Sequence, residues 1–363
     1  MNGDSERDDL RQKFLSQTDW AAARLVWLAQ DASTRRYARL TGTNSRTAIL
    51  MDAPSVEDPA CSPEMSDAER VISGWNAQTR LAASRIDAFV LIADYLRQEG
   101  FRPPEIYAFD CQKGFALIED FGPAREFARL IEKGDADEVD LYRRAACLLA
   151  KLHAKPAPKL LVKGSEKWPI LTLDALALRV STDLFVDWLP ALDPRMTMNE
   201  SIRAHWTEAR DNLIDLTARF PRHFILRDFH AENLLLLENG EIGLLDFQDA
   251  LLGWDAWDMA MLTQDARRSV SGAAEDAAIR SYLDQSGEAE ADFKERLAVI
   301  GTLNALRIIG VFARLQVRDG KPRYGSFMPR QQWLLARNLK HPSVKTMRDF
   351  VMAAAPLVFE THP

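Results

Sequence analysis

Three side chains at a fixed spacing have the types needed for phosphoryl transfer. Asp228 is followed after four residues by Asn233, and Asp246 lies thirteen residues beyond Asn233. In phosphoryl transfer one carboxylate accepts the proton of the attacking hydroxyl, while an amide and a second carboxylate hold Mg²⁺ on the phosphates of ATP. The spacing therefore predicts that Asp228 is the catalytic base and that Asn233 and Asp246 bind the metal. The alternative is that Asp228 caps a turn and Asn233 satisfies backbone groups.

The segment between Asn233 and Asp246 has the pattern of a β-hairpin. Two apolar runs, at residues 234–237 and 242–245, flank Asn239-Gly240, a dipeptide that strongly favours a tight hairpin turn. A hairpin returns the chain to the end from which it started. We therefore expect the two metal-binding residues to face one cleft, together with Asp228.

Residues 1–120 mix helical and strand patterns. We expect a helix over residues 4–30, strands over 37–40 and 47–51 around a turn at 41–44, helices over 69–82 and 86–99, and strands over 105–110 and 115–119. This order is typical of a small α+β lobe that is built on an antiparallel sheet.

Beyond Gly122 the apolar residues follow mainly helical spacing, apart from strand segments at 224–226 and in the hairpin. The most apolar helix, over residues 297–317, is interrupted by Asn304, Arg307 and Arg314. A membrane span needs about 18 or more apolar residues in a row. We therefore expect this helix to be buried in the larger domain.

Composition narrows the class of protein. The 363 residues suggest two domains or lobes, at roughly 100–200 residues each. The formal net charge of −7 argues against nucleic-acid binding, which needs a basic surface. The three cysteines form no CxxC pair, and the first 17 residues lack an apolar signal segment. We expect reduced thiols, a cytoplasmic location and no membrane attachment, and we infer no obligate protein partner.

The segment from Leu226 to Asp249 resembles the catalytic loop of protein kinases and, more closely, that of aminoglycoside phosphotransferase-like kinases. In those families the matching Asp is the base, and the matching Asn and the later Asp bind Mg²⁺. The resemblance thus implies the same roles for Asp228, Asn233 and Asp246. The sequence departs from the superfamily at Leu226, where His is common.

The resemblance implies an α+β, protein-kinase-like bilobal fold. Residues 1–120 would form an N-terminal nucleotide-binding lobe, and residues 121–363 a mainly helical lobe with the catalytic and substrate-binding residues. Several segments look like one bacterial subfamily, the anomeric N-acetylmuramate/N-acetylglucosamine kinases of cell-wall recycling: residues 31–37, 51–54, 117–122, 246–250, 264–268, 321–324 and 337–342. This similarity covers nearly the whole chain. It implies ATP-dependent phosphorylation of an amino sugar at its anomeric hydroxyl, which yields the sugar 1-phosphate.

The loop before the first hairpin strand is the expected phosphate-binding segment. Small residues there let backbone N–H groups approach phosphates. Ser33 and Thr34 add hydroxyl donors, while Arg35, Arg36 and Arg39 add the positive charge that an acidic protein needs locally to hold ATP. The alternative is a solvated basic turn.

One kinase feature is missing from the sequence. The third-strand lysine of kinases would fall in residues 47–51, which contain no Lys or Arg. Side chains alternate along a strand, so residues 37 and 39 share one face and residue 36 the other. We predict that Arg36, or failing that Arg39, replaces the lysine. Glu119 and Phe121 match the hinge of kinases and are expected beside the nucleotide.

The acceptor hydroxyl must reach Asp228. Four neighbouring residues are expected to contact the acceptor: Arg227, His230, Gln248 and Asp249. The family resemblance gives Asp258 the role of bracing the catalytic loop. An N-acetylmuramate acceptor would bring a lactyl carboxylate, for which the sequence leaves four cations open: Arg227, Arg267, Arg323 and Arg330.

Two other functions stay open at this point. A related kinase could act on an aminoglycoside or an amino alcohol, although the Lys/Arg-rich segment 321–362 does not suit a polycationic acceptor. A nucleotide-binding pseudokinase would explain the missing lysine. The intact set of Asp228, Asn233 and Asp246 argues against the pseudokinase more strongly than the missing lysine argues for it.

Overall fold

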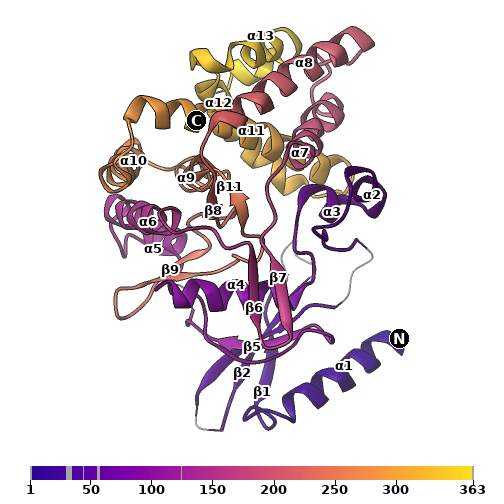
Figure 1. Ribbon diagram of the computed structural model, residues 1–363, viewed down its shortest axis with the longest axis vertical. Helices are drawn as coiled ribbons and strands as arrows, with labels where there is room; N and C mark the ends of the chain where they lie inside the picture. Colours follow the sequence, from indigo (N-terminus) through magenta and orange to yellow (C-terminus); the bar gives the residue numbers. More distant parts are fainter. Residues whose placement is uncertain (1, 30–34, 44, 55–57, 124, 362–363) are drawn as a thin grey trace. The chain divides into compact units, whose positions relative to one another are not determined.

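The computed structural model describes residues 2–29, 35–43, 45–54, 58–123 and 125–361 (Figure 1). The chain forms two compact units, and each contains several segments. The first unit comprises Met1–Arg129, Pro158–Leu171 and Glu232–Ala250, and the second comprises Leu130–Ala157, Thr172–Ala231 and Leu251–Pro363. The functional division expected at residue 120 stays a prediction.

The first unit contains most of the strands (Figure 1). Its elements are α1 (Asn2–Leu15), β1 (Arg24–Trp27), β2 (Arg36–Thr41), β3 (Thr47–Asp52), α2 (Asp67–Ser73), α3 (Trp75–Thr79), α4 (Ile86–Gln98), β4 (Ile106–Asp110), β5 (Phe115–Glu119), β6 (Leu160–Lys163), β7 (Glu166–Pro169), β9 (Leu234–Leu236) and β10 (Ile242–Leu244). α5 (Phe127–Lys133) begins in this unit and ends in the second. The strands expected before residue 120 are confirmed within one or two residues.

Five strands form one antiparallel sheet in the order β1-β2-β3-β5-β4. Alternate side chains point to opposite faces of a sheet. On one face Leu40 and Leu50 are fully buried in a cluster that includes Phe14 of α1. The ring of Phe14 stacks on Phe115 of β5 with 5.5 Å between centroids. The alternate residues of β2 and β3, such as Tyr37, therefore face away from α1.

The helix expected over residues 4–30 is wrong beyond Leu15. The chain turns after α1, and β1 then pairs with β2 from Arg24↔Thr41 to Trp27↔Ala38. A β-branched and an aromatic residue, Val26 and Trp27, favour a strand once a partner is present. The partner is β2, which begins nine residues after β1 ends, and the apolar spacing of residues 4–30 does not reveal this pairing.

The predicted hairpin around Asn239-Gly240 is confirmed. β9 and β10 pair antiparallel in the register Leu234↔Leu244, and Gly240 has φ +81°, which the turn requires. The hairpin joins the rest of the first unit through backbone hydrogen bonds. Leu244 N–H donates to Arg102 O at 2.9 Å, and Leu236 N–H donates to Arg125 O at 2.9 Å. These bonds hold the two ends of the hairpin within the unit that contains the large sheet.

The second unit is mainly helical (Figure 1). Its elements are α6 (Glu138–His153), α7 (Ala175–Trp188), α8 (Glu200–Leu216), β8 (His223–Ile225), β11 (Leu251–Gly253), α9 (Asp255–Thr263), α10 (Gly272–Ser286), α11 (Glu290–Val317), α12 (Met328–Asn338) and α13 (Lys345–Ala354). Short 3₁₀ helices connect them at Leu189–Ala191, Thr217–Arg219, Pro322–Phe327, Pro342–Val344 and Pro356–Phe359. Helices α6 and α10 lie side by side, and α11 packs against α7, α9 and α12.

Helix α11 is the core helix that the sequence predicted. Among the described residues it alone is long and apolar enough to cross a membrane, yet 89% of its most apolar window is buried inside the protein. Its apolar side chains are therefore covered by neighbouring helices. The fold class is α+β, as expected, with an antiparallel sheet near the N-terminus and a mainly helical remainder.

Candidate active site

The sheet face opposite α1 borders a cavity of about 380 Å³. All of its lining residues belong to the first unit. Most of them are apolar, and two, Asn233 and Asp246, are predicted metal ligands. The described lining residues are Leu28, Tyr37, Arg39, Ile49, Met51, Phe89, Ile118, Glu119, Asp120, Phe121, Gly122, Glu126, Asn233, Leu235, Leu245 and Asp246. The cavity thus combines an apolar wall with oxygen ligands, which suits a nucleotide with a flat base and charged phosphates.

The predicted hinge residues lie at this cavity, and ion pairs hold the segment in place. Glu119 accepts two hydrogen bonds from Arg102, at 2.5 and 2.7 Å, and one from the Glu105 N–H at 3.0 Å. Its neighbour Asp120 accepts from Arg39 at 2.6 and 3.1 Å. The carboxylate of Glu119 is therefore engaged by Arg102 and by the Glu105 backbone. The part of Glu119 that an adenine base could contact is its backbone. Phe121 lines the same cavity.

The hairpin brings Asn233 and Asp246 together. Leu245 N–H donates to Asn233 O at 2.9 Å, so the residues just outside the two strands remain adjacent. The ring of Phe247 is buried and stacks on Phe89 of α4 with centroids 4.8 Å apart, which anchors the segment that carries Asp246. Asp246 itself has φ +54°. A left-handed non-glycine residue costs about 1–3 kcal/mol, a strain that is often found at functional sites.

The chemistry of this donor set fits Mg²⁺. A hard cation prefers oxygen ligands, and Asn233 and Asp246 offer an amide and a carboxylate oxygen at the same cavity. The Asp246 side chain is 42% exposed, and its Oδ1 accepts a hydrogen bond from Gln248 Nε2 at 2.8 Å.

The arginines of the segment that we expect to bind phosphate lie in different surroundings. Arg35 Nη2 lies 4.0 Å from Asp246 Oδ1, and its side chain is only 12% exposed. Burial opposes its charge, but Tyr37, Asp249 and Asp246 together raise the pKa of Arg35 above its ordinary value. Arg36 instead pairs with Asp52 at 3.0 Å on the α1 side of the sheet. Ser33 and Thr34 lie outside the described residues.

Gln248 and Asp249 brace the segment that carries Asp246, a predicted metal ligand. Gln248 is buried, and its Nε2 donates to Asp246 Oδ1 at 2.8 Å and to Asp249 Oδ2 at 3.3 Å. Asp249 also accepts from the Ala82 N–H at 2.6 Å. The Oε1 atom of Gln248 is buried and has no hydrogen-bond partner among the described residues. An acceptor molecule with an N–H or O–H group would satisfy it.

The loop that carries Asp228 belongs to the second unit. The buried carboxylate of Asp258 accepts from the Leu226 N–H at 2.7 Å and the Arg227 N–H at 2.8 Å. Trp257 Nε1–H donates to Arg227 O at 3.1 Å. Arg227 has φ +74°, so this part of the loop is strained and needs such support. Asp258 therefore contacts the loop directly, as the family resemblance implied, and Asp228 follows it in a half-buried position.

Two further cations flank this loop. Arg267 Nη1 lies 3.3 Å from His230 Nε2, which makes His230 a partner of Arg267. Arg307, on α11, lies over the ring of Trp257 at 5.4 Å. Asp228 raises the pKa of Arg307, but burial outweighs this effect and lowers it to about 10. The sequence interpretation missed Arg307 as a functional candidate. The sequence signal was present, because Arg307 and Arg314 are the two cations in the apolar stretch 297–317 of this helix.

A network of buried polar side chains stabilises the loop that carries Asp228. Tyr282 OH donates to Asp255 Oδ2 at 3.2 Å and lies 2.9 Å from His153 Nδ1, and His153 Nε2 lies 3.4 Å from Asp258. Asp255 in turn pairs with Arg296 at 2.8 and 3.1 Å. The network therefore extends from α11 to the carboxylate that holds the catalytic loop.

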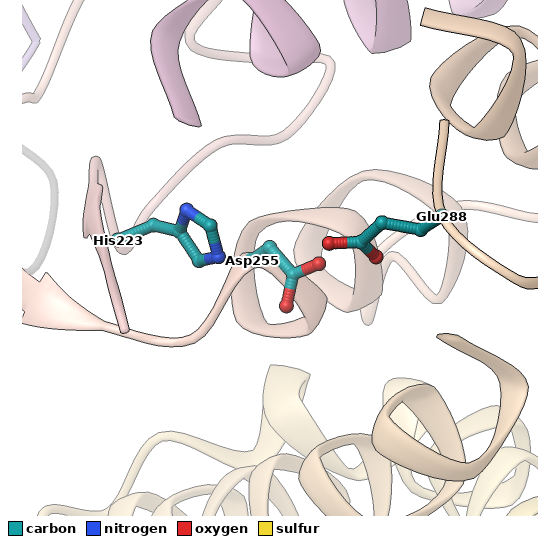
Figure 2. Close-up of side chains that lie close together, drawn as sticks. All are labelled: His223, Asp255 and Glu288. Carbon is teal, nitrogen blue, oxygen red and sulfur yellow. The ribbon is translucent and has the colours of Figure 1, made fainter. Parts of the chain in front are cut away.

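Asp255 also belongs to a cluster with metal-ligand side chains. His223, Asp255 and Glu288 have donor atoms within 4.8 Å of one another, with Asp255 between the other two (Figure 2). Arg296 donates to both carboxylates. One guanidinium already pairs with both acids, so we assign this cluster a structural role.

The Arg296→Met variant is expected to lose about 3–5 kcal/mol of unfolding free energy, because it leaves a buried carboxylate without its partner. Burial alone would raise the pKa of Asp255, but Arg296 holds it below its ordinary value. The stabilisation is therefore complete above the unfolded pKa, near 3.9, and is lost as the pH falls through the lower folded pKa. Urea denaturation at pH 7 measures the loss. The double variant Arg296→Met/Asp255→Leu should recover part of it, and a loss below 1 kcal/mol in the single variant would contradict the assignment.

Comparisons with known proteins agree with this arrangement. The phosphotransferase enzyme family matches residues 25–294. The chain is 41% identical to the N-acetylmuramate/N-acetylglucosamine kinase of Caulobacter vibrioides, over 91% of this chain and 92% of that protein. It is 31% identical to the kinase of the same name from Pseudomonas aeruginosa, over 85% of this chain and 81% of that protein.

A solved structure shows the same fold. The microcompartment-associated aminopropanol kinase matches with a TM-score of 0.59 and 15% identity, over 93% of this chain and 99% of that one. The expected protein-kinase-like fold and the expected family resemblance are both confirmed. The protein is an ATP-dependent kinase, and the chain belongs to the phosphotransferase enzyme family.

Proposed function

We propose that the protein transfers the γ-phosphoryl group of ATP to the anomeric hydroxyl of N-acetylmuramate, N-acetylglucosamine or both, and releases the sugar 1-phosphate. The acceptor class rests on the similarity to the kinases named above. The observation that carries the chemistry is that Asn233 and Asp246 lie together at one apolar cavity. We further propose a cytoplasmic role in the recycling of peptidoglycan sugars.

The cavity would bind ATP. The adenine would lie against apolar side chains such as Ile49, Met51 and Ile118, where the hinge backbone at Glu119 offers hydrogen-bonding groups. The phosphates would then point to the end of the cavity that Asn233 and Asp246 line. These two residues would hold Mg²⁺, which neutralises phosphate charge when bound.

Asp228 is the proposed catalytic base. It would orient the 1-hydroxyl of the sugar toward the γ-phosphorus and accept its proton as the O–P bond forms and the bond from phosphorus to ADP breaks. The oxygen keeps its bond to C1, so the anomeric configuration is retained. Asp258 acts as a positioning residue, because it holds the backbone on which Asp228 is mounted.

Arg35 is the proposed replacement for the missing strand lysine. It is the arginine of the loop that lies near Asp246, whereas Arg36 pairs with Asp52 and Arg39 pairs with Asp120. A guanidinium beside the metal-binding carboxylate can donate to phosphate oxygens and remains charged at any physiological pH. Sequence alternation favoured Arg36, but the contacts favour Arg35.

The Arg35→Met variant should lower kcat/KM for ATP by about 10²-fold, because it removes a preorganised cation from the phosphates. Arg35→Lys should recover part of the loss, since charge is kept but the planar fork is not. Steady-state kinetics with varied ATP measures this. Arg36→Met should have the smaller effect. If Arg36→Met had the larger one, the role would move to that residue.

The function itself is tested with a panel of acceptors. The protein is incubated with Mg·ATP and N-acetylmuramate, N-acetylglucosamine, kanamycin or choline, and the product is identified by phosphorus NMR. The expected product is a sugar 1-phosphate, shown by coupling of phosphorus to the anomeric proton. Turnover with kanamycin or choline alone would replace the proposal with an aminoglycoside or amino-alcohol kinase.

A further inference from the structure

The catalytic loop of the second unit is flanked by guanidinium groups. Arg307 approaches from α11 and lies over Trp257, whose indole N–H donates to Arg227 O, next to Asp228 in the chain. Arg267 approaches from the segment after α9, where it contacts His230. Arg267 thus contacts the loop that carries Asp228 directly, and Arg307 is linked to it through Trp257. A cationic surrounding is unsuited to a polycationic acceptor and suits an anionic one.

Arg307 differs from the other buried arginines in its partners. Arg296 pairs with Asp255 and Glu288, and Arg210 pairs with Asp183 at 2.6 Å. Within the described part of the chain, the hydrogen bonds of Arg307 go only to neutral groups. Its Nε and Nη2 donate to Asn304 Oδ1 at 3.1 and 2.8 Å, and Nη2 also lies 3.9 Å from the sulfur of Met261.

Burying a guanidinium in apolar surroundings is costly, and for Arg307 the nearby charge of Asp228 offsets only part of that cost. Burial lowers the pKa of Arg307 to about 10, which leaves the group charged at neutral pH. The two hydrogen bonds to Asn304 fix its orientation. Arg307 is therefore charged and held in one orientation, and its hydrogen bonds to the described residues go only to neutral groups. Such a guanidinium can form an ion pair with an anionic group of a ligand without rearranging.

The other candidate arginines have different partners. Arg330 Nε donates to Asp265 O at 2.8 Å, and Arg323 lies over the ring of Tyr324 at 5.1 Å. Neither of these contacts involves the loop of Asp228. The phosphates of ATP are served by Arg35 in the proposed function, so the cations beside the base face the acceptor.

We propose that Arg307, assisted by Arg267, forms a carboxylate-binding subsite that recognises the acidic substituent of an acceptor sugar. This inference rests on the proposed function, because it assumes that Asp228 contacts the acceptor. The subsite selects N-acetylmuramate over N-acetylglucosamine, since the two sugars differ by the lactyl group that carries the carboxylate. Arg307 is then a specificity-determining residue, which the sequence did not place among the candidates.

The test combines a variant with a change in the substrate. Kinetics with N-acetylmuramate, its methyl ester and N-acetylglucosamine are measured for the parent protein and for Arg307→Met. The variant should lose about 10- to 100-fold in kcat/KM for N-acetylmuramate, the loss expected for hydrogen bonds to a charged group, and less than about 2-fold for N-acetylglucosamine. The ester should be a poor acceptor for the parent and should lose nothing further in the variant.

Arg314→Met is the matched control. Arg314 lies on the same helix, burial lowers its pKa as well, and its charged neighbours are Arg318 and Asp319. It should leave the preference between the two sugars unchanged. Arg307→Lys, with thermal unfolding of each variant, separates a loss of charge from a loss of folding.

Two outcomes would overturn the subsite. One is an equal fall of kcat/KM with both sugars, which would place Arg307 on the phosphates or on the base itself, and the other is no fall with either sugar. Failure of the proposed function looks different, because the parent protein would then phosphorylate neither sugar. In that case calorimetric binding of N-acetylmuramate to the parent protein and to Arg307→Met decides the subsite directly, and equal affinities would reject it.

Discussion

The Asp228→Asn variant is expected to lose about 10²–10⁴-fold in kcat while its affinity for Mg·ATP stays within about twofold of the parent value. Asn has the shape of Asp but cannot accept the proton of the attacking hydroxyl. The cavity that we assign to ATP is lined by residues of the first unit, whereas Asp228 belongs to the second. Nucleotide binding and proton transfer therefore depend on different residues, and the variant should separate them.

The measurement pairs single-turnover kinetics with calorimetric titration of Mg·ATP. Asp215→Asn is the control, because Asp215 is an exposed carboxylate on α8 in the same unit. It should behave like the parent protein. An Asp228→Asn variant with more than about a tenth of the parental kcat would reject the base assignment, since general-base catalysis contributes at least about 10²-fold.

The Asp246→Asn variant is expected to lose about 10²–10³-fold in kcat, together with the benefit of magnesium for nucleotide binding. A carboxylate is a far stronger ligand for Mg²⁺ than an amide. Removing the negative charge also takes from Arg35, at 4.0 Å, one of the two carboxylates that stabilise its charge, the other being Asp249. The lost metal ligand weakens the hold on the triphosphate, so this variant should be defective in binding as well as in turnover.

Nucleotide titrations with and without Mg²⁺ distinguish this result from that of Asp228→Asn. In the parent protein Mg²⁺ should strengthen ATP binding, and in Asp246→Asn it should have little influence. The Glu241→Gln variant is the matched control. Glu241 lies in the same hairpin beside the Asn239-Gly240 turn, and its exposed carboxylate accepts from Asn239 Nδ2 at 2.5 Å. If Asp246→Asn retained a normal response to Mg²⁺, the metal would have to be held elsewhere.

The second unit contains the proposed substrate subsite and the polar network that stabilises the loop of Asp228. Asp258 holds the backbone before Asp228, and the chain of contacts through His153 and Tyr282 ends at the Asp255–Arg296 pair. Replacing a residue of that pair should therefore first lower the free energy of unfolding. Turnover should fall only as the loop loses its support, which separates this role from a direct catalytic one.

The sequence by itself determined the features that depend on neighbouring residues. The Asn239-Gly240 turn and its two apolar flanks are sufficient to specify a hairpin, and the hairpin makes Asn233 and Asp246 adjacent. The apolar periodicity of α11 likewise predicted a buried helix. Alternation along β2 correctly separated Arg36 from Tyr37, because side-chain direction in a strand has a period of two.

Only the tertiary structure decided which arginines lie near the predicted metal ligand Asp246 and near the loop of the predicted base Asp228. Three arginines lie close together in the sequence, at positions 35, 36 and 39. In the structure Arg36 pairs with Asp52 and Arg39 pairs with Asp120, whereas Arg35 lies near Asp246. Arg307 is separated from Trp257 by fifty residues, and the residues between them give no sign of the contact. The apolar spacing of residues 4–30 predicts a helix and so missed β1, which depends on its pairing with β2, the next strand in the chain. Ion pairs and cross-strand partners join distant parts of the chain, and local pattern and propensity carry no information about them.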